Sequence, residues 1–155
     1  MIDVAVKNAP GPIAKLKKTS KVELWVSIRD FQGKTYVDVR EHFLLADDRQ
    51  WHPTKKGVMV ALPFVGEVIA GVEALHGHSD IGTVAVIEKS KRDEIQIAIR
   101  EFESHRYGEL RVWYAEDGEK QPSNKGVTFR LALLDDLLGA LRAADKYVGR
   151  LQEKE

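Results

Sequence analysis

The sequence predicts an α+β fold built from two copies of one unit, in which four antiparallel strands precede a single helix. Segments with alternating apolar and polar residues fill most of each half, and this period of two is typical of strands with one buried face. Each half closes with apolar residues at helical spacing. The halves also match each other at a nearly constant offset, which indicates an internal repeat.

The composition is that of a globular protein, since 43% of the 155 residues are hydrophobic and 31% are charged. The sequence contains no cysteine, which excludes disulfides and thiolate metal sites. No apolar run reaches the roughly 20 residues of a membrane span. We therefore expect no membrane association, and a location in the cytoplasm or nucleoid, or in the nucleus of a eukaryote.

The formal net charge is zero, from 24 basic and 24 acidic side chains. An overall positive charge, the simplest sign of a nucleic-acid binder, is therefore missing. The charges are unevenly spread, however: lysines collect in residues 1–21, whereas acids collect in residues 101–103 and 116–119. Any basic surface must be local.

The first half begins with an arm, followed by a short strand and a hairpin. Residues 1–12 contain two prolines and a glycine and predict a flexible arm. A short strand is expected at 13–16, and residues 22–31 alternate strictly. The apolar positions of that alternation are Val22, Leu24, Val26 and Ile28. A turn at 32–34 and a second alternating segment at 35–43 complete the hairpin.

A fourth strand and a helix follow a polar connection. Residues 51–62 predict the strand, with Pro53 near its start, where a missing N–H is tolerated. Pro63 suits the first helical position, and apolar residues recur at helical spacing as far as Leu75. Gly77 suits the left-handed residue that ends a helix.

The second half repeats this plan. Arg29 and Arg100 lie 71 residues apart, as do Arg40 and Arg111, and residues 131–151 predict a closing amphipathic helix. The repeats span residues 13–78 and 79–155. A unit of about 70 residues is too small to bury a sizeable core alone, so we expect the two repeats to pack together.

Residue patterns typical of enzymes and metal sites are missing from the sequence. It has no Gly-rich phosphate loop with its lysine and no nucleophile elbow. His76 and His78 lie close together, but two ligands fall short of the three or four that a metal site needs. We therefore expect no enzymatic activity, no metal and no cofactor.

Aromatic and cationic side chains share the face of the first predicted sheet that points to solvent. By alternation this row contains Trp25, Arg29, Phe31, Tyr36 and Arg40. A single-stranded nucleic acid would suit such a row, because its bases stack on rings while its phosphates bind cations. Further positive charge comes from Lys34, Lys55 and Lys56.

A purely structural interpretation fits the same residues. The aromatics could pack under a helix or at a dimer contact, and the arginines could pair with nearby carboxylates. The candidate carboxylates are Glu23, Asp38 and Glu41. The residue pattern alone leaves both interpretations open.

Two segments of the first copy form a specific pattern, VSIRDFQGKTYVDVRE at residues 26–41 and PTKKGV at residues 53–58. They resemble the single-stranded-DNA-binding core of the family of transcriptional coactivator positive cofactor four (PC4, also called p15 or Sub1). The resemblance covers residues 13–76 and, more loosely, 84–151. It implies a curved four-stranded antiparallel sheet followed by one helix, dimerised so that two sheets form neighbouring DNA channels. Because both copies lie in one chain, we expect an intrachain pseudo-dimer.

The resemblance also assigns contacts to individual residues of the first copy. Beside the outward Trp25, the nucleic-acid-binding positions are Arg29, Phe31, Lys34, Arg40, Phe43, Lys55 and Lys56. Strict alternation turns Phe43 away from Arg40, so the strand must bend or bulge there if Phe43 is to stack on a base. Gln32 replaces a lysine that is usual in the family, which removes one phosphate contact.

In the second copy the matching positions are Arg100, Phe102, Arg111, Tyr114 and Lys125. The turn lysine is replaced by His105, and Arg106 would take over its role. Glu103 and Asn124 are further departures from the family pattern. We therefore expect the second channel to bind more weakly, or to contact a protein.

The resemblance implies a non-enzymatic protein that binds single-stranded DNA with little sequence preference and acts as a transcription coactivator. RNA or melted duplex could take the place of DNA, and transcription or repair proteins are candidate partners. The alternative is a protein-interaction or dimerisation scaffold in such complexes, without direct nucleic-acid binding. Oligomerisation beyond the intrachain pair stays open in both cases.

Overall fold

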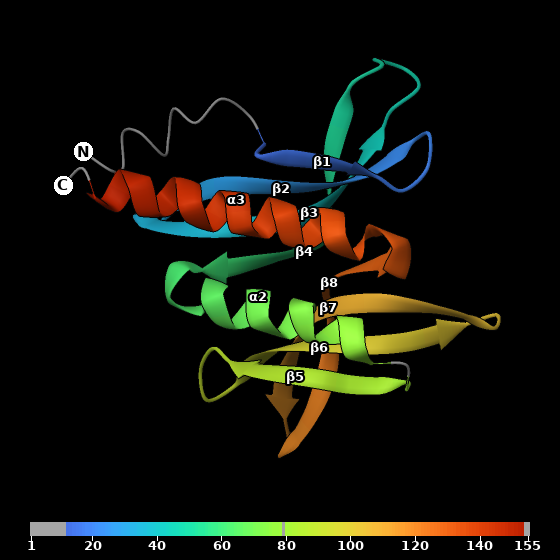
Figure 1. Cartoon of the computed structure of the whole chain (residues 1–155), viewed down its shortest axis with the longest axis vertical. Coiled ribbons are helices and arrows are strands. Elements are labelled where there is room, and N and C mark those ends of the chain that lie inside the picture. The colour runs from blue at the N-terminus through green and yellow to red at the C-terminus, as the bar shows by residue number, and fades with distance from the viewer. Residues whose placement is uncertain (1–11, 79, 154–155) are drawn as a thin grey trace.

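The computed structural model describes residues 12–78 and 80–153 and contains two antiparallel sheets, each with its four strands in sequence order (Figure 1). The first sheet consists of β1 (Ala14–Lys17), β2 (Val22–Phe31), β3 (Lys34–Leu44) and β4 (Trp51–Ala61). The second consists of β5 (Gly82–Glu88), β6 (Asp93–Phe102), β7 (His105–Glu116) and β8 (Glu119–Arg130). The predicted α+β class is confirmed. The arm predicted at residues 1–12 lies outside the described residues, except for Pro12.

A 3-10 turn leads into each helix. η1 (Leu62–Phe64) precedes α2 (Val65–Ala74), which η2 (Leu75–Gly77) follows, and η3 (Leu131–Leu133) precedes α3 (Leu134–Glu153). The fourth strand thus ends one residue earlier than predicted, and Pro63 lies in η1, where its missing N–H is not needed. Within the part of the chain that the structure describes, no helix has the length and apolar character of a membrane span.

Two-residue turns connect the long central strands of both sheets. Gln32 and Gly33 have φ angles of 52° and 76°, and Glu103 and Ser104 have φ angles of 50° and 67°. Positive φ at both positions is typical of the type I′ turn, whose twist matches that of the strands. The second repeat therefore keeps the same hairpin without its glycine.

The same irregularity interrupts the pairing of the last two strands in each sheet. In the first sheet the pairing steps from Arg40–Gly57 to His42–Pro53, so three residues of β4 lie opposite one residue of β3. A matching step follows Arg111 in the second sheet. The bulges comprise residues 54–56 and 123–125. A bulge bends its strand and redirects the side chains beside it.

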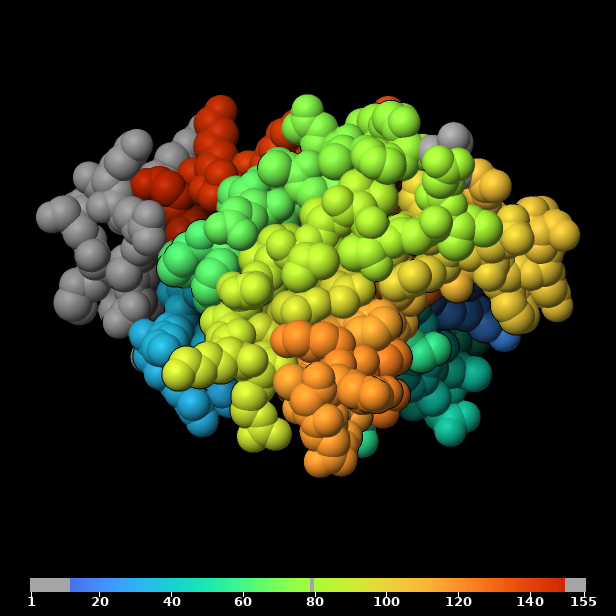
Figure 2. Space-filling view, turned by 90° about the horizontal axis from the view of Figure 1, so that it is seen from below, coloured from blue at the N-terminus to red at the C-terminus, as the bar shows by residue number. Residues whose placement is uncertain are grey.

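Each helix covers the sheet of the other repeat. α2 lies against β5 and β6, and α3 lies across β1, β2 and β3 (Figure 1). Figure 2 shows the first contact from another side, with α2 in green lying along β5 in yellow-green. The approach is close at Gly71, since a Cβ added there would be 2.6 Å from Cδ1 of Ile97. The two helices also pack against each other.

One continuous hydrophobic core therefore joins both repeats. It includes fully buried side chains of both sheets, such as Val37 and Ile97, and of both helices, such as Val72 and Leu137. The expected intrachain pseudo-dimer is confirmed. The sequence repeats differ from the packing units, however, because each repeat leaves its own sheet to be covered by the helix of the other.

Candidate functional site

The face of the first sheet that points away from α3 carries the arginines of the first repeat, and we call it the first arginine face. Along β2, the buried Leu24 and Val26 alternate with Trp25 and Arg29. The strand period of two puts neighbouring residues on opposite faces. The outward row expected from the sequence is therefore present.

Asp38 lies between the two arginines of this face. Its carboxylate accepts two hydrogen bonds from Arg40, at 3.1 Å from Nε and 3.0 Å from Nη2, and lies 3.6 Å from Nη1 of Arg29. The Asp38 side chain is only 3% exposed, and a buried carboxylate needs such partners. The structural pairing considered from the sequence thus exists. Two guanidinium groups against one carboxylate still leave a net positive charge.

The two arginines differ in their freedom to move. Arg40 also donates a 2.8 Å hydrogen bond from Nη1 to the carbonyl of Thr54. Its guanidinium covers Gly57, where an added Cβ would be 2.5 Å from Cζ of Arg40, so a larger residue would displace it. Arg29 has a half-exposed side chain and one long contact, to Asp38. Arg29 can therefore exchange Asp38 for an incoming anion, whereas Arg40 is fixed.

The aromatic residues of the first arginine face differ in a similar way. Trp25 stacks on His42 with ring centroids 3.9 Å apart, and Nζ of Lys15 lies 4.4 Å from the Trp25 centroid. The indole N–H of Trp25 donates to Glu23 at 2.9 Å. Trp25 is therefore already engaged within the sheet. Phe31, at the end of β2, is 53% exposed and presents an open ring.

His42 makes the contact with Trp25 sensitive to pH. Burial lowers the pKa of His42 below its ordinary value of 6.5, while its contact with the Arg40 carbonyl and the charge of Asp38 oppose this effect. The unfolded chain therefore takes up this proton at a higher pH than the folded chain. We predict that the free energy of unfolding falls as the pH drops from about 6.5 towards the lowered pKa of His42.

The variant His42→Phe should lack this part of the pH dependence, because it keeps an aromatic ring but cannot titrate. Urea unfolding of both proteins at about pH 7.5 and about pH 5.5 measures the difference. An equal loss of stability in the variant and the wild type would contradict the assignment to His42.

Phe43 and Tyr114 lie on the faces opposite the arginines. β2 and β3 pair without interruption, so Phe43 stays beside Val22 and points away from Arg40. The bulge that stacking by Phe43 would require is present, but it lies in β4 and leaves β3 regular. Phe43 packs near His52 instead, with ring centroids 5.8 Å apart. Tyr114 has the corresponding place in β7, so neither ring is brought to an arginine face.

The second sheet repeats the arrangement around Glu109, and we call this surface the second arginine face. The Glu109 carboxylate lies 3.2 Å from Nε of Arg100 and 3.2 Å from Nε of Arg111. Arg111 also donates to the carbonyl of Ser123 at 2.8 Å and covers Gly126. The predicted arginine pair of the second repeat therefore also surrounds one carboxylate, but Arg100 lies closer to Glu109 than Arg29 lies to Asp38.

The aromatic residues of the second arginine face are placed differently. At the repeat offset, Trp113 takes the position of His42, and Gln96 takes the position of Trp25. The indole N–H of Trp113 is buried and has no hydrogen-bond partner within the described ranges. Phe102, at the end of β6, is 67% exposed.

Carboxylates surround the hairpin tip of the second arginine face. Exposed Glu101 and Glu103 flank Phe102, and Glu101 lies 3.7 Å from Nε of Arg106. At the tip of the first face Asp30 is the counterpart of Glu101, but Gln32 stands in place of Glu103, and the exposed Lys34 in place of His105. The two tips therefore differ in charge, although their backbones match.

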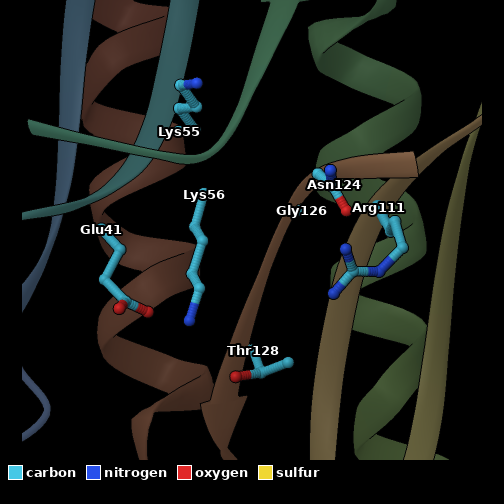
Figure 3. Close-up of a pocket in the computed structure, with 7 residues that line it drawn as sticks. All are labelled: Glu41, Lys55, Lys56, Arg111, Asn124, Gly126 and Thr128. Carbon is cyan, nitrogen blue, oxygen red and sulfur yellow. The ribbon is translucent and has the colours of Figure 1, made fainter. Parts of the chain in front are cut away.

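The bulge lysines lie at the seam between the repeats, where β4 and β8 are neighbours. A cavity of about 360 Å³ at this seam is lined by Arg111 together with Lys55 and Lys56, which lie on its opposite side (Figure 3). Lys125 of the second repeat lines another cavity with Arg40. Each bulge thus adds positive charge beside the arginine of the other repeat. The sequence of one repeat considered alone does not reveal this contact.

The site expected from the sequence omits His42 and Trp113, which the structure places on the arginine faces. Each of them follows an arginine by two residues, after Arg40 and Arg111 respectively, so alternation assigns it to the same face. The repeat offset of 71 residues also pairs the two positions. Both signals are present in the sequence.

The fold and the two arginine faces define a class of protein, in which a duplicated sheet-and-helix unit presents paired arginines and exposed phenylalanines. The family profile described as Transcriptional Coactivator p15 (PC4) matches residues 18–63 and 89–140. These segments include most of the strands of both repeats and together more than half of the chain. The chain therefore belongs to this family.

Solved structures of PC4 homologues align with part of the chain. A homologue from Burkholderia pseudomallei is 28% identical, and the alignment covers 43% of this chain and 92% of that chain with a TM-score of 0.40. A bacteriophage T5 homologue of the eukaryotic coactivator, implicated in recombination-dependent DNA replication, is 17% identical, with coverages of 49% and 92% and a TM-score of 0.38. A comparison with curated proteins gave no match.

Proposed function

We propose that the chain binds single-stranded DNA with little sequence preference, mainly through its first arginine face. The observation that carries this proposal is the half-exposed Arg29 beside the open ring of Phe31, on a sheet face that points away from the helix. A ring for a base and a cation for a phosphate are the contacts that a single strand requires. Membership of a coactivator family supports the same function.

Binding would begin with an exchange of anions at Arg29. A phosphate replaces Asp38 beside Arg29, and Asp38 stays paired with Arg40, so no buried carboxylate is left alone. A base then stacks on Phe31, and Lys34 at the hairpin tip attracts the next phosphate. In duplex DNA the base faces are already stacked inside the helix, so this surface favours single strands.

The second arginine face would contribute less to DNA binding. Arg100 and Arg111 are both within 3.2 Å of Glu109, and the side chain of Arg100 is less exposed than that of Arg29. The carboxylates around Phe102 repel phosphates. Its remaining positive charge comes mainly from the seam lysines of the first repeat.

A second candidate function is docking of a protein at the second hairpin tip. Phe102 is 67% exposed and is flanked by Glu101 and Glu103, a combination that suits an apolar pocket with a basic rim. A transcription or repair protein with such a surface would fit, and the pseudo-dimer would then serve as a scaffold. Loss of a protein complex in Phe102→Ala, without any DNA-binding defect, would favour this function.

Binding of a labelled oligothymidine should weaken as salt rises, with a slope near 0.7 per neutralised phosphate in a plot of log affinity against log salt. Substituting Arg29 with glutamine should lower the slope by about 0.7, because one phosphate contact is lost. Fluorescence anisotropy at several salt concentrations measures both slopes. A duplex of the same length and an oligouridine serve as comparisons, and equal or tighter binding to the duplex would refute the proposal.

A further inference from the structure

Two cavities at the seam correspond to each other when the repeats are exchanged. The second-face cavity, shown in Figure 3, contains Arg111 and Glu41. The first-face cavity, of about 350 Å³, contains Arg40 and Val112. Val112 is the counterpart of Glu41, 71 residues later in the chain. A carboxylate in one cavity is thus replaced by an apolar side chain in the other.

The replacement removes the counter-ion of a lysine. In the first repeat, Nζ of Lys18 lies 2.9 Å from Oε2 of Glu41, and both side chains are largely buried. Lys89 is the counterpart of Lys18 and lines the first-face cavity beside Val112, half-buried. An ammonium group at this depth is stabilised by an anionic partner; Val112 cannot supply one, which leaves the charge of Asp93 to offset that of Lys89.

The first-face cavity collects positive charge from both repeats. Its lining consists of Arg40, Lys55, Gly57, Met59, Lys89, Val112, Asn124 and Lys125. Four of these residues are cations, and none of the described residues that line the cavity has a carboxylate, although Arg40 is paired with Asp38 beside it. Burial lowers the pKa of Lys89; the charge of Asp93 opposes this effect, and the positive charge of Lys125 adds to it. A volume of this size lies at the small end of ligand sites.

We propose that the first-face cavity binds a phosphate group between Arg40, Lys89 and Lys125. A phosphate offers several acceptor oxygens to separate cations, and such charge-assisted hydrogen bonds are the strong ones. This inference rests on the proposed function where the phosphate belongs to a bound DNA strand, and free phosphate has the same chemistry. In the second-face cavity the carboxylate of Glu41, which is paired with Lys18, takes the place of such an anion.

Reciprocal substitutions at the two counterpart positions test this site. Val112→Glu should give Lys89 the carboxylate that Lys18 has, and Glu41→Val should remove it from the second-face cavity. Calorimetric titration with inorganic phosphate should show one saturable site in the wild type, none in Val112→Glu and two in Glu41→Val. Absence of saturable binding to the wild type would overturn the proposal.

Lys89→Gln keeps the proposal testable if Val112→Glu does not fold. It should weaken phosphate binding about tenfold or more, as expected for the loss of a hydrogen bond from a charged group. Lys91→Gln, which changes an exposed lysine of the same loop, is the matched control and should bind phosphate as the wild type does. Equal binding by the Lys89 and Lys91 variants would overturn the proposal.

Oligothymidines with and without a 5′-phosphate identify the source of the phosphate. A preference for the phosphorylated strand that disappears in Lys89→Gln indicates a strand end, and an equal weakening of both strands indicates the backbone. Binding of inorganic phosphate without any oligothymidine binding would support the cavity and refute the proposed function. If the protein bound oligothymidine but not inorganic phosphate, and Lys89→Gln did not change oligothymidine binding, the proposed function would stand and the phosphate site in the cavity would be refuted.

Discussion

Replacing Phe31 with alanine should weaken oligothymidine binding about 5- to 150-fold. The expected loss equals the roughly 1–3 kcal/mol that one stacked base contributes. Phe31 is 53% exposed and lies at the end of β2, so its ring is free to receive a base, whereas Trp25 is already stacked on His42. Fluorescence anisotropy with a labelled oligothymidine at fixed salt measures the change.

Phe102→Ala is the matched control, because Phe102 has the same place in the second repeat and is similarly exposed. Its effect on oligothymidine affinity should be much smaller, since Glu103 repels the phosphates of a strand stacked there and His105 stands in place of the attracting Lys34. Neither substitution removes a buried side chain, so both variants should melt within a few degrees of the wild type. Equal effects of the two substitutions on affinity would show that the two faces bind DNA equally well, and would refute the proposal that the first arginine face is the main binding surface.

Replacing Leu137 with alanine should lower the free energy of unfolding by about 2–5 kcal/mol, the usual cost of emptying a buried leucine site. Leu137 is fully buried in α3, the helix that covers the first sheet. A substitution in the second repeat should therefore also expose amides of the first sheet. Urea unfolding measures the loss in the free energy of unfolding. Hydrogen exchange of the amides of β2, β3 and β6 shows which sheet is destabilised.

Arg142→Ala provides the control for Leu137→Ala in the same helix. Arg142 lies 2.6 Å from Glu73 of α2, but both side chains are more than half exposed, and exposed ion pairs contribute at most about 1 kcal/mol. Its effect on unfolding should stay below this value. Faster hydrogen exchange in β6, with β2 and β3 still protected, would contradict the finding that α3 of the second repeat covers the sheet of the first.

Much of the fold follows from local patterns. Strict alternation predicts β2 with its observed bounds, Val22–Phe31, because the strand lies between a basic turn and a glycine turn. The repeat offset then transfers the plan to the second half, including an arginine pair that the structure again places around one carboxylate. Alternation also assigns Phe43 to the face opposite Arg40, as the register of β2 and β3 shows.

The placement of the helices does not follow from the sequence pattern. Periodicity shows that α2 and α3 each have an apolar stripe, but either sheet could accept either stripe. The close approach of Gly71 to Ile97 depends on the tertiary arrangement and is visible only in the structure. For the same reason, single-repeat reasoning places Lys55 and Lys56 on the first sheet alone, although the bulge carries both to the Arg111 cavity at the seam.

Because the two copies lie in one chain, a carboxylate can be kept in one repeat, at Glu41, and lost at the counterpart position of the other, Val112. An assembly of two identical chains would carry every substitution twice, so both of its faces would change together. Here each position is altered once, so the two arginine faces differ, with Lys34 at the hairpin tip of the first face and Glu103 at that of the second. If a bound DNA strand crossed both faces, its two 5′-to-3′ directions would not be equivalent, as they would be in an assembly of two identical chains.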